Sequence, residues 1–484
     1  MTDDTYPKLA LLIGGEWLEQ ASAGTREVTN PATEEILGAL PLAGPRELDA
    51  CLESAADGFR RWRKTAGAQR GRVLQRAADV LRQRTETIGR WLTMEEGKTL
   101  TEAKLEIEAA AENLEWNGRQ ADQIELKMSP APMRGVAATV SSDPVGVVAA
   151  FTPWNFPAMV PARKIAPALA AGCAVILKPA EETPATAMGI VQALREAGAP
   201  DGVVQLVCGD PADVSSRLIA SPVVRKISFT GSVPVGKHLA RLAADAMKPG
   251  IWELGGHGPA IVLDDADVAL AATTLARFKS RNAGQVCTAP SRFYVHASIH
   301  DAFVEALVLE LDRLTLGNGL EANVDVGPLA NERRLDAMIR LVDDALARGA
   351  KLVRGGKRRG DRGFFFELTV LTDVSDDALI LQEEPFGPIA PVVRFESIDG
   401  VIAKANGLPY GLSSYVFTQS EERANALVDA LEAGLVQVNC AAPVRADTPM
   451  GGVKDSGYGY EGGSRGIDEY LLQKLVHRPS EVLE

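Results

Sequence analysis

Short apolar runs alternate with helical patterns from Val136 onward, and this alternation limits the fold more than any other feature of the chain. Repeated strand-helix units at this spacing predict a parallel, doubly wound sheet with helices on both faces. Such sheets bind ligands beyond the carboxyl ends of their strands, so the residues that follow each strand are the first candidates for a site. The expected strands are Val145–Phe151, Ala174–Lys178, Val203–Cys208, Val224–Phe229 and Ala260–Leu263, and the expected helices are Ala162–Ala171, Thr183–Ala197, Ala212–Ile219 and Val235–Asp245.

The flanking segments extend this α/β pattern in both directions. Apolar residues at three-to-four spacing predict covering helices over Arg46–Lys64 and Ala68–Trp91. A second alternating series predicts a second α/β domain, reached by a short crossing near residue 255. Its expected helices are Asp301–Leu314 and Glu332–Arg348, its expected strands are Lys351–Val353, Phe365–Leu371, Ile389–Phe395 and Ser414–Phe417, and a final strand or extended arm is expected over Leu472–Val482.

Composition narrows the classes of function. The 64 acidic and 51 basic residues give a net charge of -13, which argues against binding to nucleic acid or to an anionic membrane. The N-terminus lacks the pattern of a signal peptide, and no apolar run approaches the ~18 residues of a membrane span, so we expect a cytoplasmic protein. The five cysteines are widely spaced without a CxxC pair, and the five histidines show no ligand spacing. Neither a disulfide framework nor a metal site is therefore expected.

Three motifs follow predicted strands. Phe229–Gly236 closes a strand and opens a helix, where glycines and the helix N-terminus suit a pyrophosphate, although the segment is not GxGxxG and also fits an ordinary turn. Lys178 and Glu181 could hydrogen-bond an adenosine ribose, or could lie in a solvated loop. Phe151–Pro157 is stiffened by two prolines around Asn155, whose amide could donate to an oxyanion, or it is a structural proline turn.

The segment Arg281–Cys287 ends in a cysteine after a polar stretch interrupted by glycine. Taken alone, an unpaired cysteine is more often a small buried apolar residue than a nucleophile. Its interpretation therefore depends on the other motifs.

Together the motifs resemble the aldehyde dehydrogenase superfamily, over nearly the whole chain from about Leu12 to Val476. The likeness rests on five motifs in the family's order, which are far more specific together than any one of them. They are Pro153–Pro157 (PWNFP), Phe229–Ser232 (FTGS), Glu253–Gly256 (ELGG), Gly284–Cys287 (GQVC) and Glu383–Pro388 (EEPFGP).

The resemblance implies a mechanism. Cys287 attacks the aldehyde, because an sp² carbonyl carbon needs an added nucleophile before it can release hydride. The Asn155 side chain and the Cys287 backbone N–H hold the oxyanion. Hydride passes to a nicotinamide, and Glu253 activates water to hydrolyse the thioester. For Glu253 the competing interpretation is a carboxylate satisfied by backbone amides.

The resemblance also implies the cofactor. A carboxylate at the position of Glu181 accepts hydrogen bonds from both ribose hydroxyls and repels a 2'-phosphate, so we expect NAD to be preferred over NADP. Glu384 and Phe386 match the residues that hold and pack against the nicotinamide ribose. The full set of expected cofactor residues is Thr152, Trp154, Lys178, Glu181, Gly231, Ser232, Val235, Glu384 and Phe386.

Within the superfamily the chain is most similar to succinate-semialdehyde and α-ketoglutarate-semialdehyde dehydrogenases. Arg163 and Arg281 match arginines that grip the distal carboxylate of the substrate, although either could be an ordinary ion-pair partner. The family's substrate-binding serine is replaced by Val444, which Arg445 follows. Arg445 is therefore a candidate contact for a longer, branched or more highly charged substrate, such as a keto-acid semialdehyde or a sulfonated aldehyde.

The family pattern predicts two doubly wound Rossmann-like α/β domains and a small β arm for oligomerisation. The expected limits are 1–125 and 145–255 for the NAD-binding domain, 256–457 for the catalytic domain, and 126–144 with 470–484 for the arm, which suggests a homodimer or homotetramer. Some relatives pair the catalytic cysteine with a second one two residues away, but Ala289 occupies that position here, so we expect no such disulfide.

Two other functions compete with this prediction. A non-catalytic nucleotide-binding relative would have lost turnover, but Asn155, Glu253 and Cys287 are all present. A CoA-acylating enzyme would need the thioester to escape hydrolysis, and such relatives usually lack the base at the position of Glu253. Hydrolytic oxidation is favoured over both.

Overall fold

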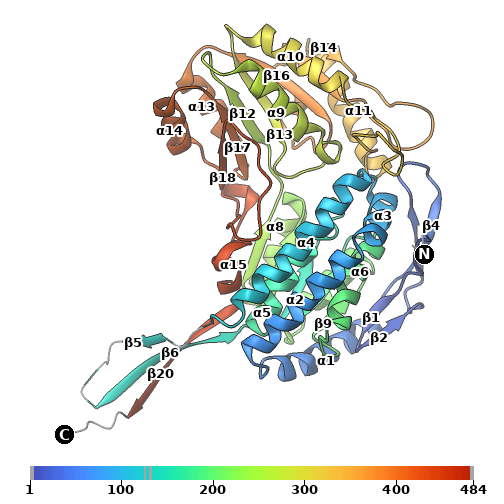
Figure 1. Ribbon diagram of the computed structural model, residues 1–484, viewed down its shortest axis with the longest axis vertical. Helices are drawn as coiled ribbons and strands as arrows, with labels where there is room; N and C mark the ends of the chain where they lie inside the picture. Colours follow the sequence, from blue (N-terminus) through green and yellow to red (C-terminus); the bar gives the residue numbers. More distant parts are fainter. Residues whose placement is uncertain (1–4, 125–126, 130–132, 134, 480–484) are drawn as a thin grey trace.

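The computed structural model describes residues 5–124, 127–129, 133 and 135–479, and Figure 1 shows two sheet-and-helix bodies with a narrow arm. The structure confirms the predicted fold class, since two Rossmann-like α/β units each surround a mainly parallel sheet. No helix among the described residues is long and apolar enough to cross a membrane.

The first sheet has eight strands, and its central part is parallel as predicted. Both edges are antiparallel, because β1 and β2 form a hairpin beside β9 and β19 returns from the far end of the chain to pair with β11. In spatial order the strands are β19 (Gly457–Tyr458), β11 (Gly250–Glu253), β10 (Val224–Thr230), β7 (Val147–Phe151), β8 (Ala174–Lys178), β9 (Val204–Leu206), β1 (Leu11–Ile13) and β2 (Glu16–Leu18).

Helices cover both faces of this sheet, which explains why its strands read as continuous apolar runs. In β7, Val148 and Ala150 pack into one core while Val147, Ala149 and Phe151 pack into the other. The helices are α1 (Pro45–Trp62), α2 (Gly67–Gln83), α3 (Thr85–Glu96), α4 (Leu100–Gln120), α5 (Met159–Ala171), α6 (Pro184–Glu196), α7 (Pro211–Ala220), α8 (Val233–Asp245) and α15 (Gly463–Asp468).

The single helix predicted over Ala68–Trp91 is wrong, because α2 ends before Arg84 and α3 begins after it. The hydroxyl of Thr85 donates to the carbonyl of Arg82 at 2.9 Å. Such a local side-chain bond competes with continuation of the helix.

The second sheet has seven strands, and β14 forms its only antiparallel pair among the described strands. The predicted strand over Phe365–Leu371 is shorter, because the described strand begins at Thr369. In spatial order the strands are β14 (Lys351–Arg354), β15 (Thr369–Thr372), β16 (Ile389–Phe395), β13 (Pro290–His296), β12 (Gly258–Val262), β17 (Ser413–Phe417) and β18 (Leu435–Val438). The helices are α9 (Val268–Ser280), α10 (His300–Asp312), α11 (Glu332–Ala347), α12 (Leu379–Gln382), α13 (Ile398–Asn406) and α14 (Glu421–Ala430), with short 3₁₀ turns η1 (Arg281–Gly284) and η2 (Lys454–Ser456).

The arm that projects at the bottom of Figure 1 is a three-stranded antiparallel sheet in the order β20 (Leu471–Pro479), β6 (Val136–Pro144), β5 (Lys127–Ser129). Parts of the predicted arm segments and the first four residues lie outside the described residues. A separate hairpin joins β3 (Thr25–Thr29) to β4 (Ile36–Pro41). The role of the arm in oligomerisation and the domain limits stay predictions.

Candidate active site

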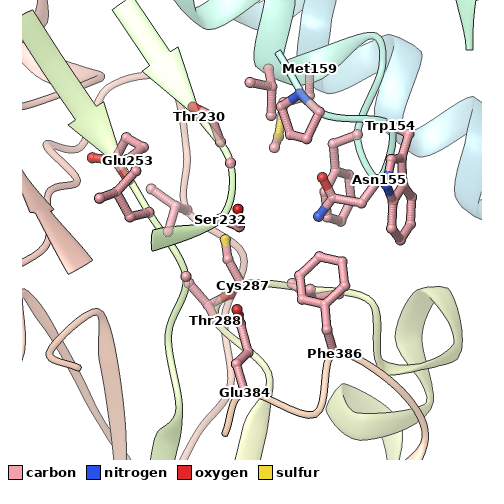
Figure 2. Close-up of a pocket in the computed structure, with 18 of the residues that line it drawn as sticks. Trp154, Asn155, Met159, Thr230, Ser232, Glu253, Cys287, Thr288, Glu384 and Phe386 are labelled. Carbon is pink, nitrogen blue, oxygen red and sulfur yellow. The ribbon is translucent and has the colours of Figure 1, made fainter. Parts of the chain in front are cut away.

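A cavity of about 630 Å³ lies where the two α/β units meet. The first sheet reaches it with the carboxyl ends of its strands, because Thr230 ends β10 and Glu253 ends β11 directly beside it. Figure 2 shows Glu253, Asn155 and Cys287 around the same space, although they come from three separate segments. The fold therefore places the three predicted catalytic residues on one cavity.

The cysteine loop is a strained turn that the surrounding structure holds in place. Asn282 and Ala283 have positive φ angles of 49° and 51°, which side chains rarely adopt, and Gly284 follows at 74°. The side-chain amide of the fully buried Gln285 donates to the Asn282 carbonyl at 3.1 Å and accepts from the Ala330 N–H at 2.9 Å. These bonds fix the backbone immediately before Cys287.

Hydrogen bonds tie Asn155 to this loop. Its Nδ2 donates to the Gln285 carbonyl at 3.0 Å, which leaves the second amide hydrogen for another acceptor. The backbone carbonyl of Asn155 accepts hydrogen bonds from Lys98 Nζ at 2.7 Å and from Asn282 Nδ2 at 3.0 Å. Lys98 is in turn paired with Glu106 at 2.6 Å, and both side chains are buried.

Removal from water is the largest influence on the pKa values of Glu253 and Cys287. Burial, reinforced by the nearby Glu461 carboxylate, raises the pKa of Glu253 well above its usual range. Glu253 Oε1 is buried and has no hydrogen-bond partner among the described residues. Burial also raises the pKa of the Cys287 thiol to about 12, with Glu253 and Glu384 adding to the effect. The thiol therefore needs a proton acceptor or a compensating charge to react near neutral pH.

Two of the three predicted specificity arginines line the cavity. Arg163, on α5, is buried, with Nη2 donating to the Val444 carbonyl at 3.0 Å and Nη1 lying 3.5 Å from Met450 Sδ. Arg281 lies over the Phe156 ring at 5.1 Å from its centroid. Across the described residues, neither arginine forms an ion pair with a carboxylate.

Arg445 is placed differently. Its side chain is 70% exposed, its Nε lies 3.3 Å from Asp447 Oδ1, and it is absent from the cavity lining that includes Val444. The structure therefore does not bring Arg445 together with Arg163 and Arg281.

The predicted nicotinamide residues lie on the cavity wall. The Trp154 and Phe386 rings meet edge to face with centroids 5.5 Å apart, and Figure 2 shows both side chains at the cavity. Glu384 Oε1 accepts from the Gly256 N–H at 3.0 Å, and its removal from water raises its pKa to about 7. A carboxylate held by one backbone donor keeps acceptor sites for a ligand hydroxyl.

The predicted dinucleotide residues fit the extended part of a cofactor. Ser232 and Val235 lie at the exposed start of α8, where helix N–H groups favour an anion. A Cβ at Gly231 would lie 2.5 Å from the Phe229 ring, so only glycine fits this turn without a shift. The buried hydroxyls of Thr152 and Thr230 have no partner in the structure. Lys178 Nζ lies 2.5 Å from Glu181 Oε1, and both side chains are almost fully buried.

Several residues that hold the site were not found by sequence reasoning. Lys98 and Glu106 support Asn155, and Lys164 forms a buried ion pair with Glu461 at 2.6 Å beside Glu253. Lys164 carried a signal, since it and Arg163 are charged residues in an otherwise apolar segment that forms α5. Glu461 carried none, because its partner Lys164 lies 297 residues away, and the contact of Lys98 with Asn155 spans 57 residues.

The described residues contain no group of three or more His, Cys, Asp or Glu side chains that could hold a metal ion. All five cysteines are unpaired, and Cys440 is exposed. The side chains that line the cavity include a thiol, carboxylates, amides and guanidinium groups.

The fold and the site define a two-domain α/β protein with a cysteine facing the cavity between its Rossmann-like units. The sequence profile described as the aldehyde dehydrogenase family matches residues 17–476, and the chain belongs to this family. The predicted resemblance is confirmed.

Relatives over nearly the full length support the same assignment. The chain is 44% identical to 4-(hydroxymethyl)benzenesulfonate dehydrogenase TsaD1 of Comamonas testosteroni, with 96% of this chain and 97% of the relative covered. It is 38% identical to the succinate-semialdehyde dehydrogenase [NADP(+)] GabD of Escherichia coli, with 98% and 99% covered. The crystal structure of succinate-semialdehyde dehydrogenase from Burkholderia pseudomallei has a TM-score of 0.96 at 40% identity, with 98% of each chain covered.

Proposed function

We propose that the protein oxidises an aldehyde with a distal carboxylate, of the succinate-semialdehyde type, to the corresponding acid and prefers NAD. The observation that carries this proposal is the pair of guanidinium groups, Arg163 and Arg281, on the wall of the cavity that Cys287 faces. Guanidinium groups bind carboxylates through paired, charge-assisted hydrogen bonds. An acidic protein that presents two such groups beside its thiol is suited to select an anion.

In the first step the Cys287 thiol releases its proton to solvent, the thiolate sulfur bonds to the aldehyde carbon, and the carbonyl π electrons move to the oxygen. Asn155 Nδ2 and the Cys287 backbone N–H donate to the oxygen that becomes negative, which stabilises the tetrahedral thiohemiacetal. The hydrogen bond to the Gln285 carbonyl supports this role because it fixes the direction of the Asn155 amide. The bound dinucleotide supplies the hydride acceptor.

Loss of the hydride leaves a thioester on Cys287, which water must cleave to release the acid. Glu253 takes a proton from this water. Its buried Oε1 accepts no hydrogen bond from the part of the chain that the structure describes, which supports its availability to a water molecule. The raised pKa makes Glu253 a stronger base than an ordinary carboxylate.

The preference for NAD rests on Glu181. Glu181 is buried and paired with Lys178, and a carboxylate at this position accepts hydrogen bonds from ribose hydroxyl groups and repels a 2'-phosphate. Because the relative from E. coli is named as NADP(+)-linked, the preference for NAD has to be measured directly.

A sulfonated aldehyde is the second candidate. The 44% identical relative is named for a benzenesulfonate substrate, and a sulfonate offers a guanidinium the same kind of oxygen acceptors as a carboxylate. Both candidates need the same two arginines.

The test compares turnover of succinate semialdehyde and neutral butanal, with NAD and with NADP, in the wild type, Arg163→Ala and Arg281→Ala. Hydrogen bonds to charged groups contribute ~1.5–3 kcal/mol, so each variant should lose about 10- to 150-fold in kcat/KM for the anionic aldehyde only. Arg72→Ala, on the exposed face of α2, is the matched control. Equal losses on butanal would refute the anion contact. Arg445→Ala tests the separate prediction that Arg445 contacts the substrate.

A further inference from the structure

The cavity has an apolar wall that belongs to none of the large cores. Phe156, Val160, Val286 and Ala289 form a small separate cluster of buried residues, with Met159 packed against it. All except Ala289 also line the cavity, and Figure 2 shows Met159 on its wall. A cluster this small cannot be explained as part of a domain core, so its open side is available to an apolar part of the substrate.

Three further lining residues are apolar. Phe278, Val444 and Met450 line the same cavity, and the Arg281 guanidinium lies 5.9 Å from the centroid of Phe278 as well as 5.1 Å from that of Phe156. Two aromatic rings therefore flank the cation that would hold the distal anion. The cavity that holds the thiol and the guanidinium groups is therefore lined in part by aromatic, branched and thioether side chains.

Val444 makes one contribution through its backbone and another through its side chain. Its carbonyl accepts from Arg163 Nη2 at 3.0 Å, and this bond does not depend on the side chain. Val444 is among the residues that line the cavity, at the position where the family pattern predicts a serine hydroxyl. This position therefore retains the arginine contact but offers the substrate an apolar surface.

We propose that the substrate carries a flat aromatic spacer between its aldehyde and its distal anion, and that Val444 selects for this spacer. The inference rests on the proposed function, because it takes Cys287 and the two arginines as the contacts for the two ends. An aromatic ring buries more apolar surface than a short methylene chain and has no internal rotors to immobilise. A flexible chain in the same space loses rotational freedom and leaves part of the wall uncovered.

The experiment measures kcat/KM for 4-carboxybenzaldehyde, 4-sulfobenzaldehyde, succinate semialdehyde and benzaldehyde. At least one aryl anion should exceed succinate semialdehyde by about tenfold or more in the wild type. Val444→Ser, which keeps the backbone carbonyl, should lower this ratio about fivefold or more. Val428→Ser, at an exposed position of α14, is the matched control and should leave the ratio unchanged.

The outcomes separate the two proposals. A wild-type preference for succinate semialdehyde over both aryl anions overturns the aromatic spacer and leaves the anion contact standing. Equal turnover of benzaldehyde and its anionic derivatives overturns the proposed anion selection, whatever the effect of the ring. An unchanged ratio in Val444→Ser overturns the role of Val444. The two aryl anions also distinguish carboxylate from sulfonate as the distal group.

Discussion

Replacing Lys98 by methionine removes the cation from a buried pair and should destabilise the protein by about 3–5 kcal/mol. The lost contacts are the ion pair to Glu106 at 2.6 Å and the hydrogen bond to the Asn155 carbonyl at 2.7 Å. Glu106 would keep only backbone donors, the N–H groups of Ala158 at 2.8 Å and Met159 at 3.2 Å, and would remain as an uncompensated charge. Loosening of Asn155 should also lower kcat by about 10- to 100-fold, because small displacements of a catalytic donor are costly.

The double variant Lys98→Met with Glu106→Leu removes both charges and should cost less than the sum of the single changes by at least about 2 kcal/mol. Urea unfolding followed by tryptophan fluorescence measures the free energies, and steady-state kinetics give kcat and the KM for NAD. Lys104→Met is the control, since its partly exposed pair with Glu86 should contribute less than about 1 kcal/mol. Additive costs within ~0.5 kcal/mol, or an unchanged kcat in Lys98→Met, would contradict the proposed support of Asn155.

Four further predictions concern the site. Glu253→Gln should still release one burst of NADH per site but turn over at least about 100-fold more slowly, and steady turnover at the wild-type rate would exclude Glu253 as the base. Because the pKa of Glu253 is raised and only its ionised form accepts a proton, wild-type hydrolysis should increase as pH rises through that value and then level off, as a kcat profile can show. Removing this negative charge should also make Cys287 react faster with iodoacetamide at pH 8 in a Cys440→Ser background, and a slower reaction would contradict the assigned cause of its raised pKa. Gly284→Ala should destabilise the loop by more than the ~1–3 kcal/mol expected for φ strain alone, since its Cβ would lie 2.3 Å from a backbone oxygen, whereas Gly349→Ala has open space and measures the strain term by itself.

The fold was largely predictable because it follows from local patterns. Strands buried on both faces are mainly apolar. For this reason the predicted limits of β8 and β16 agree with the structure residue for residue. The break between α2 and α3 was not predicted, since the apolar spacing continues across Arg84 and only a side-chain hydrogen bond marks the end of the helix. The antiparallel edge strand β19 was also missed, because its partner β11 lies about 200 residues earlier in the chain.

Residues whose own side chains perform the chemistry could be predicted from the sequence. Residues that only position those side chains could not. Glu253 and Cys287 stand in motifs specific enough to name, and the structure places them on one cavity. Lys98 looks like an ordinary helix-end lysine in the sequence, and only the fold shows that it is buried against Asn155. The exposed position of Arg445 could not be derived either, because its distance from the cavity depends on how the loop after β18 turns.

The cysteine loop shows why such positioning is nonlocal. Its left-handed residues would be unfavourable in isolation, so the turn depends on contacts made elsewhere in the chain. Glu102 accepts from the Asn282 N–H at 3.0 Å, and the Gln285 carbonyl accepts from Asn155 Nδ2 at 3.0 Å. Because Asn282 Nδ2 also donates to the Asn155 carbonyl, the oxyanion donor and the backbone that carries the thiol are joined in both directions. A change at Asn282 should therefore disturb thiol and donor together, and its effect on kcat should not add to that of Asn155→Ala.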